Sequence, residues 1–408
     1  MKAYSISRTP QLHHGEGAIK LIGPGLASYT GTASDKGSTS DKGRAPGNGN
    51  ALLITGSSSF EQLKAYKFIM AECSKLNIDV HEYRIPREPS LSLIDEAVVR
   101  FAEYNPQLVV GLGGGSVIDA AKAIAAMIPI REPVKDYLEG VGSKSHPGSR
   151  LPFIALPTTS GTGSEATRNA VLSEVGPQGF KRSLRHMNFV PDIAILDPEL
   201  TLSCPADVTA HSGMDAFSQL LESFLSTSAN PVTDALALQG LTLISHSLLT
   251  AVRDGSNIQA RSDMALAAYL SGITLVNAGL GTVHGLAGVI GGIKEIPHGV
   301  ICSRLMGPAN VMTVRKLRIT PGSDTALSRY ALAGRTFSKR SGRSDDYYID
   351  AFLDFIIEMT TTLKIPALIQ YGVAESDLRE FARVGDNKNN PIQLDEEERF
   401  KLLLDAWR

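Results

Sequence analysis

QLVVGLGGGSVIDAAKAIAAM (residues 107–127) carries the clearest structural signal in the chain. The apolar run QLVVGL has the character of a buried strand, a glycine cluster follows it, and VIDAAKAIAAM then has a helical pattern. Short apolar runs alternate with helical stretches in the same way from ALLIT (51–55) to DIAIL (192–196). This alternation predicts a parallel sheet flanked by helices.

Beyond about residue 200 the pattern changes to long helical stretches, such as VTAHSGMDAFSQLLESFLS (208–226). The sequence therefore predicts an α/β domain over residues 1–200 and an all-helical domain over residues 201–408, with the boundary in DPELTLSCPAD (197–207). Residues 28–50 are polar and poor in large apolar side chains. We expect a flexible surface loop there and assign no function to it.

The composition argues against several classes of partner. Among 408 residues, 40 basic and 42 acidic side chains give a formal net charge of −2, and no basic block occurs. Neither nucleic acid nor a membrane is therefore expected as a partner. The three cysteines, Cys73, Cys204 and Cys302, lie far apart and predict no disulfide framework. The N-terminus has no apolar signal-peptide core, and no apolar run approaches the length of a membrane span, so we expect a cytoplasmic protein.

A first phosphate-binding candidate is the glycine cluster of the opening stretch. Gly114, Gly115 and Ser116 open a helix, where glycines allow close backbone approach and free N–H groups attract an anion. The spacing is not the GxGxxG of the dinucleotide fingerprint. The alternative is a tight turn capped by Ser116, with Asp119 three residues later completing a pair like a capping box.

A second candidate, PTTSGTGS (157–164), also follows an apolar run and is rich in hydroxyls and glycine. Two such loops at strand ends are what a dinucleotide crevice requires, although either is also compatible with an ordinary loop. After ALLIT the chain continues with Gly56, Ser57 and two further serines, without the carboxylate that commonly binds the ribose 2′-hydroxyl. This favours NADP(H) over NAD(H), unless the turn has no selectivity.

Two histidines, His284 and His298, enclose HGLAGVIGGIKEIPH. In one continuous helix they would lie about 21 Å apart. Gly291, Gly292 and Pro297 predict a break that lets the chain fold back and bring both rings to one point.

A carboxylate that could join them is Asp215, in a helical stretch with Gln219 one turn later and His211 one turn earlier. One Asp and two His suit a catalytic Zn²⁺ or Fe²⁺ ion, whereas Gln is a poor ligand. The alternative for Asp215 or His211 is helix capping or simple surface exposure.

Together these motifs resemble one family. GGGSVIDAAKAIA, PTTSGTGSEAT, DPELT, GMDAFSQLLESF and HGLAGVIGGIKEIPHGV occur in the order and approximate spacing of the iron-containing (type III) alcohol dehydrogenases. The resemblance runs from QLHHGEGAIKLIGPGL near the start to NNPIQL near the end. It implies a dehydroquinate synthase-like architecture, in which a Rossmann-like dinucleotide-binding domain is followed by an all-helical metal-binding domain. It also implies hydride transfer between NAD(P)(H) and a small alcohol or aldehyde.

The resemblance assigns roles to individual residues. The predicted cofactor-binding residues, including the turn after ALLIT, are Gly56, Ser57, Gly114, Gly115, Ser116, Asp119, Thr158, Thr159, Thr162, Asn169, Lys181 and Leu200. Asp215, His284 and His298 match metal ligands and are the predicted catalytic residues. The fourth ligand position, a His in the family, is Gln219 here. A family His near the nicotinamide is Gly288 here.

These departures leave alternatives open. The expected ion is Fe²⁺ or Zn²⁺, since the similar glycerol dehydrogenases hold Zn²⁺ with one Asp and two His. A metal-free reductase of the maleylacetate type is the main alternative. A lyase-type sugar-phosphate cyclase shares the architecture but needs basic groups that are missing near Asp215. A non-catalytic nucleotide-binding relative is the last alternative, and a homodimer is compatible with the family.

Overall fold

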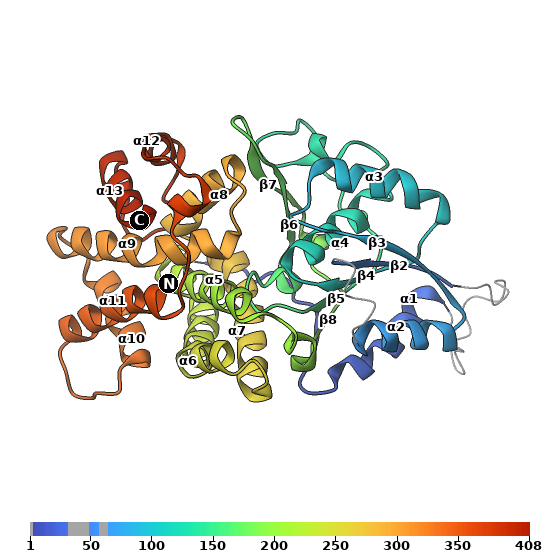
Figure 1. The fold of residues 1–408 in the computed structure, drawn as a ribbon, viewed down its shortest axis with the longest axis horizontal. Coiled ribbons are helices and arrows are strands. Elements are labelled where there is room, and N and C mark those ends of the chain that lie inside the picture. Colours follow the sequence, from blue (N-terminus) through green and yellow to red (C-terminus); the bar gives the residue numbers. More distant parts are fainter. Residues whose placement is uncertain (1–2, 32–48, 57–63) are drawn as a thin grey trace.

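The computed structural model describes residues 3–31, 49–56 and 64–408. A sheet region with its helices forms one side of the molecule and a large group of helices forms the other (Figure 1). Ser57 lies outside the described residues, and so do residues 32–48, which are most of the loop predicted over residues 28–50. At both ends that prediction was wrong, because residues 28–30 are the end of a helix and residues 49–50 the start of a strand.

The sheet has six parallel strands in the order β1-β8-β5-β4-β2-β3. The strands are β1 (Gln11–His14), β2 (Gly49–Thr55), β3 (Ile78–Arg84), β4 (Leu108–Gly113), β5 (Phe153–Pro157) and β8 (Ile193–Leu196). Because Gly113 is in register with Pro157, β4 and β5 end side by side. The two predicted phosphate loops therefore begin at neighbouring points on the carboxyl edge of the sheet.

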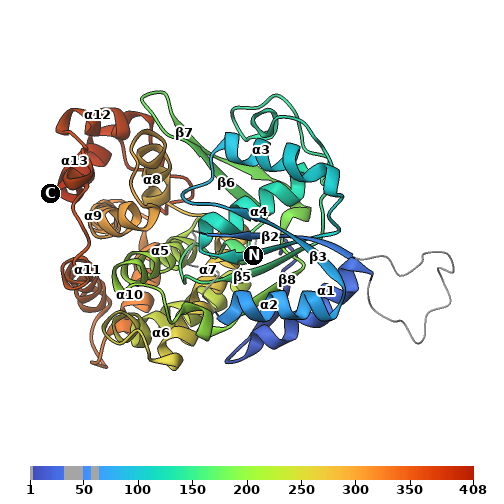
Figure 2. The same cartoon turned by 45° about the vertical axis from the view of Figure 1, so that its right-hand side comes forward.

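Helices cover both faces of this sheet, as Figure 2 shows. They are α1 (Ile22–Thr30), α2 (Lys64–Lys75), α3 (Leu91–Phe101) and α4 (Gly115–Met127). Successive strand residues point to opposite faces, so Val109 packs in the core with α3 and α4 while Val110 packs in the core with α1 and α2. An antiparallel hairpin that the sequence analysis did not predict, β6 (Asn169–Glu174) and β7 (Phe180–Arg185), extends toward the helical side.

The remainder of the described chain is helical. Its helices are α5 (Ala206–Leu225), α6 (Pro231–Arg253), α7 (Ile258–Ala278), α8 (Thr282–Ile293), α9 (His298–Ile319), α10 (Asp324–Phe337), α11 (Asp345–Thr362), α12 (Glu375–Val384) and α13 (Glu396–Trp407). The predicted fold class, an α/β part followed by an all-helical part, is thus confirmed. The exact domain boundary within 197–207 stays a prediction.

One expectation about membrane spans was wrong. By length and composition α6 could cross a membrane, with a mean hydropathy of 1.5 over its most apolar window. The segment reads as a helix in the sequence but not as a continuous apolar run, because its polar residues are scattered among the apolar ones. In the structure α6 packs against α5 and α7, and apolar side chains along it, such as Leu241 and Leu248, belong to the core of the helical part.

Candidate active site

The two histidines meet, although not in the way that the glycines predict. α8 continues through Gly291 and Gly292 and ends at Ile293, and α9 begins at His298 directly after Pro297. The break therefore lies over residues 294–297. It places the two imidazole centroids 5.5 Å apart. Gly292 instead allows close packing between α8 and the hairpin. A Cβ on this residue would lie 2.9 Å from the backbone of β7, so only a residue without a side chain lets the two elements approach this closely.

Asp215 is at the centre of the site. It lies on α5 and is 1% exposed. Its Oδ1 is 3.2 Å from His284 Nε2 and 3.8 Å from His298 Nε2. Cys302, one turn after His298 on α9, completes a group whose four donor atoms all lie within 4.8 Å of one another. A carboxylate, two imidazoles and a sulfur form a donor set that fits a divalent transition metal.

Glu222 fixes the orientation of the His284 ring. Its Oε2 is 2.6 Å from His284 Nδ1, and its Oε1 accepts a 2.7 Å hydrogen bond from the Val283 backbone. When Nδ1 donates its proton to Glu222, the lone pair on Nε2 faces the Asp215 carboxylate. Two electron-rich atoms 3.2 Å apart need a proton or a cation between them. The place between them therefore suits either a proton on His284 or a bound cation.

Gln219 contacts Asp215 through its amide nitrogen. Its Nε2 donates to Asp215 Oδ2 at 3.2 Å, while its Oε1 accepts from Ser271 Oγ on α7 at 2.7 Å. Both polar ends of the amide are thus engaged with protein groups. Gln219 therefore orients the Asp215 carboxylate, and its own oxygen is directed at Ser271, away from the two histidines and Cys302.

Metal ligands must be deprotonated, and two of the four side chains already are, whereas the other two must lose a proton to an incoming ion. Burial by itself would lower the pKa of His284, but Cys302 and Glu222 raise it well above its usual range, and burial raises the pKa of the Cys302 thiol to about 12. Burial by itself would raise the pKa of the Asp215 carboxyl, but the His298 and His284 rings outweigh burial and lower that pKa to about 2. Burial lowers the pKa of His298 to about 4, so its ring is neutral near pH 7. Burial also lowers the pKa of His211, which lies against Gly299 and is not a member of the ligand group found among the described residues.

The two predicted phosphate loops are in contact. Thr158 donates its backbone N–H to Gly113 at 2.9 Å. A Cβ on Gly114 would lie 3.3 Å from Thr159 Oγ1, and one on Gly115 would lie 2.5 Å from Thr162 Oγ1. Only residues without a side chain allow the loops to lie this close.

The alternative in which Ser116 caps α4 was wrong. The helix begins at Gly115, with Gly114 at its N-cap, and among the described residues no side chain caps it. Its first N–H groups therefore remain available for an anion such as a phosphate. Asp119 points elsewhere, because its Oδ2 accepts from the Val171 backbone of β6 at 3.1 Å.

The other predicted cofactor residues are spread around these loops. Gly56 is buried directly after β2, and Leu200 is buried in the short turn of helix after β8. The Asn169 carbonyl accepts a hydrogen bond from the buried Lys122 at 2.7 Å. Lys181 on β7 forms a 2.7 Å ion pair with Glu88 in the segment after β3. The structure thus leaves the cofactor role of all four predicted residues as predictions.

The loop after β5 contacts both the start of α4 and, through Ser271, the side chains around Asp215. Ser271 Oγ, which contacts Gln219, is 3.5 Å from the Gly161 carbonyl of this loop. Gly163 has a φ of 61°, and a Cβ on it would lie 2.4 Å from the Ala268 carbonyl. Because only glycine tolerates both constraints, the loop is seated directly on α7.

The surroundings of Gly288 matter because the resemblance places a histidine at this position. No described atom lies within 4 Å of where a Cβ on Gly288 would be, so there is open space at this position.

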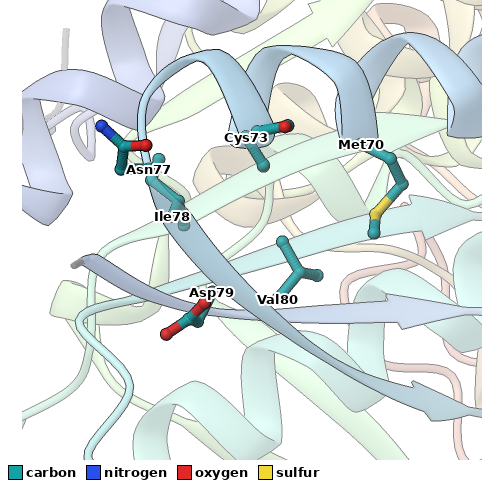
Figure 3. Close-up of a pocket in the computed structure, with 7 residues that line it drawn as sticks. Met70, Cys73, Asn77, Ile78, Asp79 and Val80 are labelled. Carbon is teal, nitrogen blue, oxygen red and sulfur yellow. The ribbon is translucent and has the colours of Figure 1, made fainter.

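A hollow of about 310 Å³, lined by Met70, Cys73 and the start of β3, lies at the amino ends of the strands (Figure 3). It is at the edge of the sheet opposite to the phosphate loops.

Sequence reasoning missed Glu222 and Cys302. Helical spacing contained a signal for each of them, because Glu222 lies seven residues after Asp215 and Cys302 lies four residues after His298. That spacing puts both on the faces of α5 and α9 that carry the predicted ligands. The sequence does not show that these two faces point at each other.

Comparisons with known proteins identify the family of the chain. Residues 34–198 match the family model for iron-containing alcohol dehydrogenase, and residues 209–407 match the C-terminal model of the Fe-containing alcohol dehydrogenase family. Alcohol dehydrogenase 4 of Schizosaccharomyces pombe is 33% identical over 330 residues, which cover 80% of this chain and 74% of that protein.

Alcohol dehydrogenase 4 of Saccharomyces cerevisiae is 38% identical over 239 residues, which are 59% of this chain and 61% of the yeast protein. The matched part thus spans about three fifths of that relative. A solved structure of an alcohol dehydrogenase from Oenococcus oeni is 27% identical, with a TM-score of 0.84 over 99% of this chain and 100% of that one. On the family models and the S. pombe relative, the chain belongs to the iron-containing alcohol dehydrogenase family.

Proposed function

We propose that the protein transfers a hydride between NAD(P)(H) and a small alcohol or aldehyde, where the phosphate loops meet α5, α8 and α9. The observation that carries this proposal is the position of Ser271, which contacts both the loop after β5 and the amide that holds Asp215. One hydroxyl thus lies between the predicted cofactor loop and the predicted metal ligands. The family membership supports the same reaction.

Asp215, His284 and His298 would hold a divalent ion, which the family supports as Fe²⁺ and the donor set also allows as Zn²⁺. Such an ion, when bound, polarises a substrate oxygen as a Lewis acid. Two neighbouring side chains would orient these ligands: Glu222 fixes the His284 ring and Gln219 fixes the Asp215 carboxylate. We therefore assign Gln219 to positioning, in preference to the ligand role that the sequence predicted.

The cofactor would lie across the two phosphate loops. The free N–H groups at the start of α4 bind phosphate, and the hydroxyls of Thr158, Thr159 and Thr162 line the adjoining loop. The nicotinamide itself gives or takes the hydride. NADP(H) is the favoured form because Gly56 and the three serines that directly follow β2 include no carboxylate to repel a 2′-phosphate. We expect a higher kcat/KM with NADPH than with NADH.

The charge balance supports further proposals about partners. A nearly neutral chain without a basic block fits a protein that works on small molecules in the cytoplasm, without nucleic acid or membrane partners. The family also suggests a homodimer, which sedimentation in solution would test.

The test measures turnover on a panel of alcohols and aldehydes before and after chelation, and in Asp215→Ala. We expect both treatments to lower kcat/KM by at least about a hundredfold, the size typical of losing an electrostatic stabiliser. Asp354→Ala, an exposed change on α11, is the control. Full activity after both treatments would favour the metal-free reductase. Cofactor binding without turnover on any substrate would favour a non-catalytic relative.

A further inference from the structure

The sulfur of Cys302 contacts both imidazoles of the group around Asp215. Cys302 is fully buried on α9, and its Sγ is 3.6 Å from His284 Nε2 and 3.5 Å from His298 Nε2. A thiol has a single proton and can donate it to only one of these nitrogens. Since sulfur also accepts hydrogen bonds, the same geometry suits a thiol between the two rings in the free protein and a thiolate when an ion is bound.

The distances between donor atoms match those around a tetrahedral ion. Metal–nitrogen bonds of about 2.05 Å and a metal–sulfur bond of about 2.3 Å separate ligand atoms by about 3.4 Å for N and O and about 3.6 Å for N and S. The Asp215 oxygen is 3.2 and 3.8 Å from the two nitrogens, and the sulfur is 3.6 and 3.5 Å from them. These are four of the six distances in the group, and all four donor atoms lie within 4.8 Å of one another, so the side chains converge on one place.

We infer that Cys302 is a fourth ligand of the divalent ion, in place of the imidazole that the resemblance expects at position 219. The inference rests on the proposed function, since it needs an ion at Asp215, His284 and His298. Gln219 does not compete for the position, because its amide nitrogen faces Asp215 and its oxygen accepts from Ser271.

Binding of the ion releases the thiol proton to solvent, and a sulfur electron pair forms the new bond. No atom changes its oxidation state. The carboxylate and the thiolate together neutralise the charge of a divalent ion. A thiolate also favours soft or borderline ions such as Zn²⁺ over hard ions such as Mg²⁺. A fifth position for a substrate oxygen stays accessible, since catalytic sites of this kind expand their coordination.

Cobalt substitution tests this inference without an activity assay. The protein is stripped by chelation and reloaded with Co²⁺, and its near-ultraviolet absorption is recorded. A thiolate ligand gives a charge-transfer band there, whereas carboxylate and imidazole ligands do not. We expect this band in the unmutated protein and in Gln219→Ala, and its loss in Cys302→Ser. Cys73→Ser is the matched control, because Cys73 is also a buried cysteine but lies on α2, away from the cluster.

The affinity for Co²⁺, measured by competition with a chromophoric chelator, should fall at least about tenfold in Cys302→Ser. Co²⁺ bound to the unmutated protein without the band would overturn the inference and leave the proposed function intact. This outcome needs no variant, so it does not depend on whether Cys302→Ser folds. If the unmutated protein binds no Co²⁺, both the inference and the metal-assisted reaction are wrong.

Discussion

Glu222 orients His284 without being one of the predicted metal ligands. One carboxylate oxygen contacts His284 Nδ1 at 2.6 Å, and the other accepts from the Val283 backbone at 2.7 Å. The carboxylate is thereby fixed, and it in turn fixes both the tautomer and the direction of the ring. A ligand imidazole held in this way is more basic and loses less entropy on binding an ion.

Glu222→Gln should therefore weaken metal binding without unfolding the protein. The amide is close to the carboxylate in size but has no charge, so His284 loses the partner that raises its basicity. We expect the affinity for Zn²⁺ or Co²⁺ to fall by about ten- to a hundredfold in a chelator competition. Glu358→Gln, an exposed change on α11, should leave the affinity unchanged. Equal affinities in the two variants would contradict a role for Glu222 in positioning His284.

At the same scale, sequence reasoning named Asp215, His284 and His298, and the structure brings these three together. Cys302 escaped because a lone buried cysteine is usually just a small apolar residue. Its chemistry depends on two side chains from other parts of the chain, and helical spacing says nothing about such neighbours.

The start of α4 is the element on which cofactor binding depends. Gly115 begins the helix, and a Cβ there would lie 2.5 Å from Thr162 Oγ1 and 2.9 Å from its Cγ2. The glycine therefore serves to let the neighbouring loop approach the uncapped end of the helix. Its conformation is helical, so an alanine is resisted only by the contact with Thr162.

Gly115→Ala should separate the two loops and weaken cofactor binding. We expect the KM for NADPH to rise by about tenfold or more, while metal content stays the same because the cluster lies on other helices. Gly176→Ala is the control, because no described atom lies within 4 Å of its Cβ position. An unchanged KM in a folded Gly115→Ala protein would mean that the loops need not touch to bind the cofactor.

Helix α8 shows where sequence patterns mislead. Gly291 and Gly292 suggested a break, yet the helix continues through both, because its buried, apolar residues pack well enough to offset the poor helix propensity of glycine. The break comes at residues 294–297, and Pro297 is the N-cap of α9.

At the scale of the whole molecule, the junction between the sheet and the helices contains a buried carboxyl group. Glu165 is 3% exposed, in the short helical turn that follows the β5 loop and packs on α7. Burial raises the pKa of Glu165 to about 7, although nearby Lys122 partly opposes that shift. Lys122 itself is fully buried, and burial lowers its pKa to about 8.

The contribution of Glu165 to stability should therefore fall as the pH rises from about 5 to about 7, whereas the lowered pKa values of His298 and His211 act in the opposite direction. In this range folded Glu165 keeps its proton and unfolded Glu165 loses it, so the folded state binds more protons and becomes less favourable at higher pH. The shift from 4.5 to about 7 corresponds to about 3 kcal/mol in the free energy of unfolding. Lys122 titrates above this range and does not mask the effect.

Glu165→Gln should remove this contribution, so the variant gains stability relative to the unmutated protein as the pH rises from 5 to 7. Urea unfolding at the two pH values measures the difference. Glu174→Gln, an exposed change at the end of β6, should keep the original pH dependence. The same slope in Glu165→Gln and in the unmutated protein would show that Glu165 is not the group responsible.

The sequence by itself determined the fold class, the two glycine-containing loops and three ligand residues. The fold class and the loops follow from local periodicity and residue type, whereas the set of three predicted ligands, Asp215, His284 and His298, is what the resemblance to the family implies. The tertiary structure decided which faces meet. It alone shows that Glu222 holds His284, that Gln219 presents nitrogen to Asp215, and that the Cys302 sulfur joins the cluster. The physical reason is that α5, α8 and α9 converge through packing between distant segments, which no local pattern encodes.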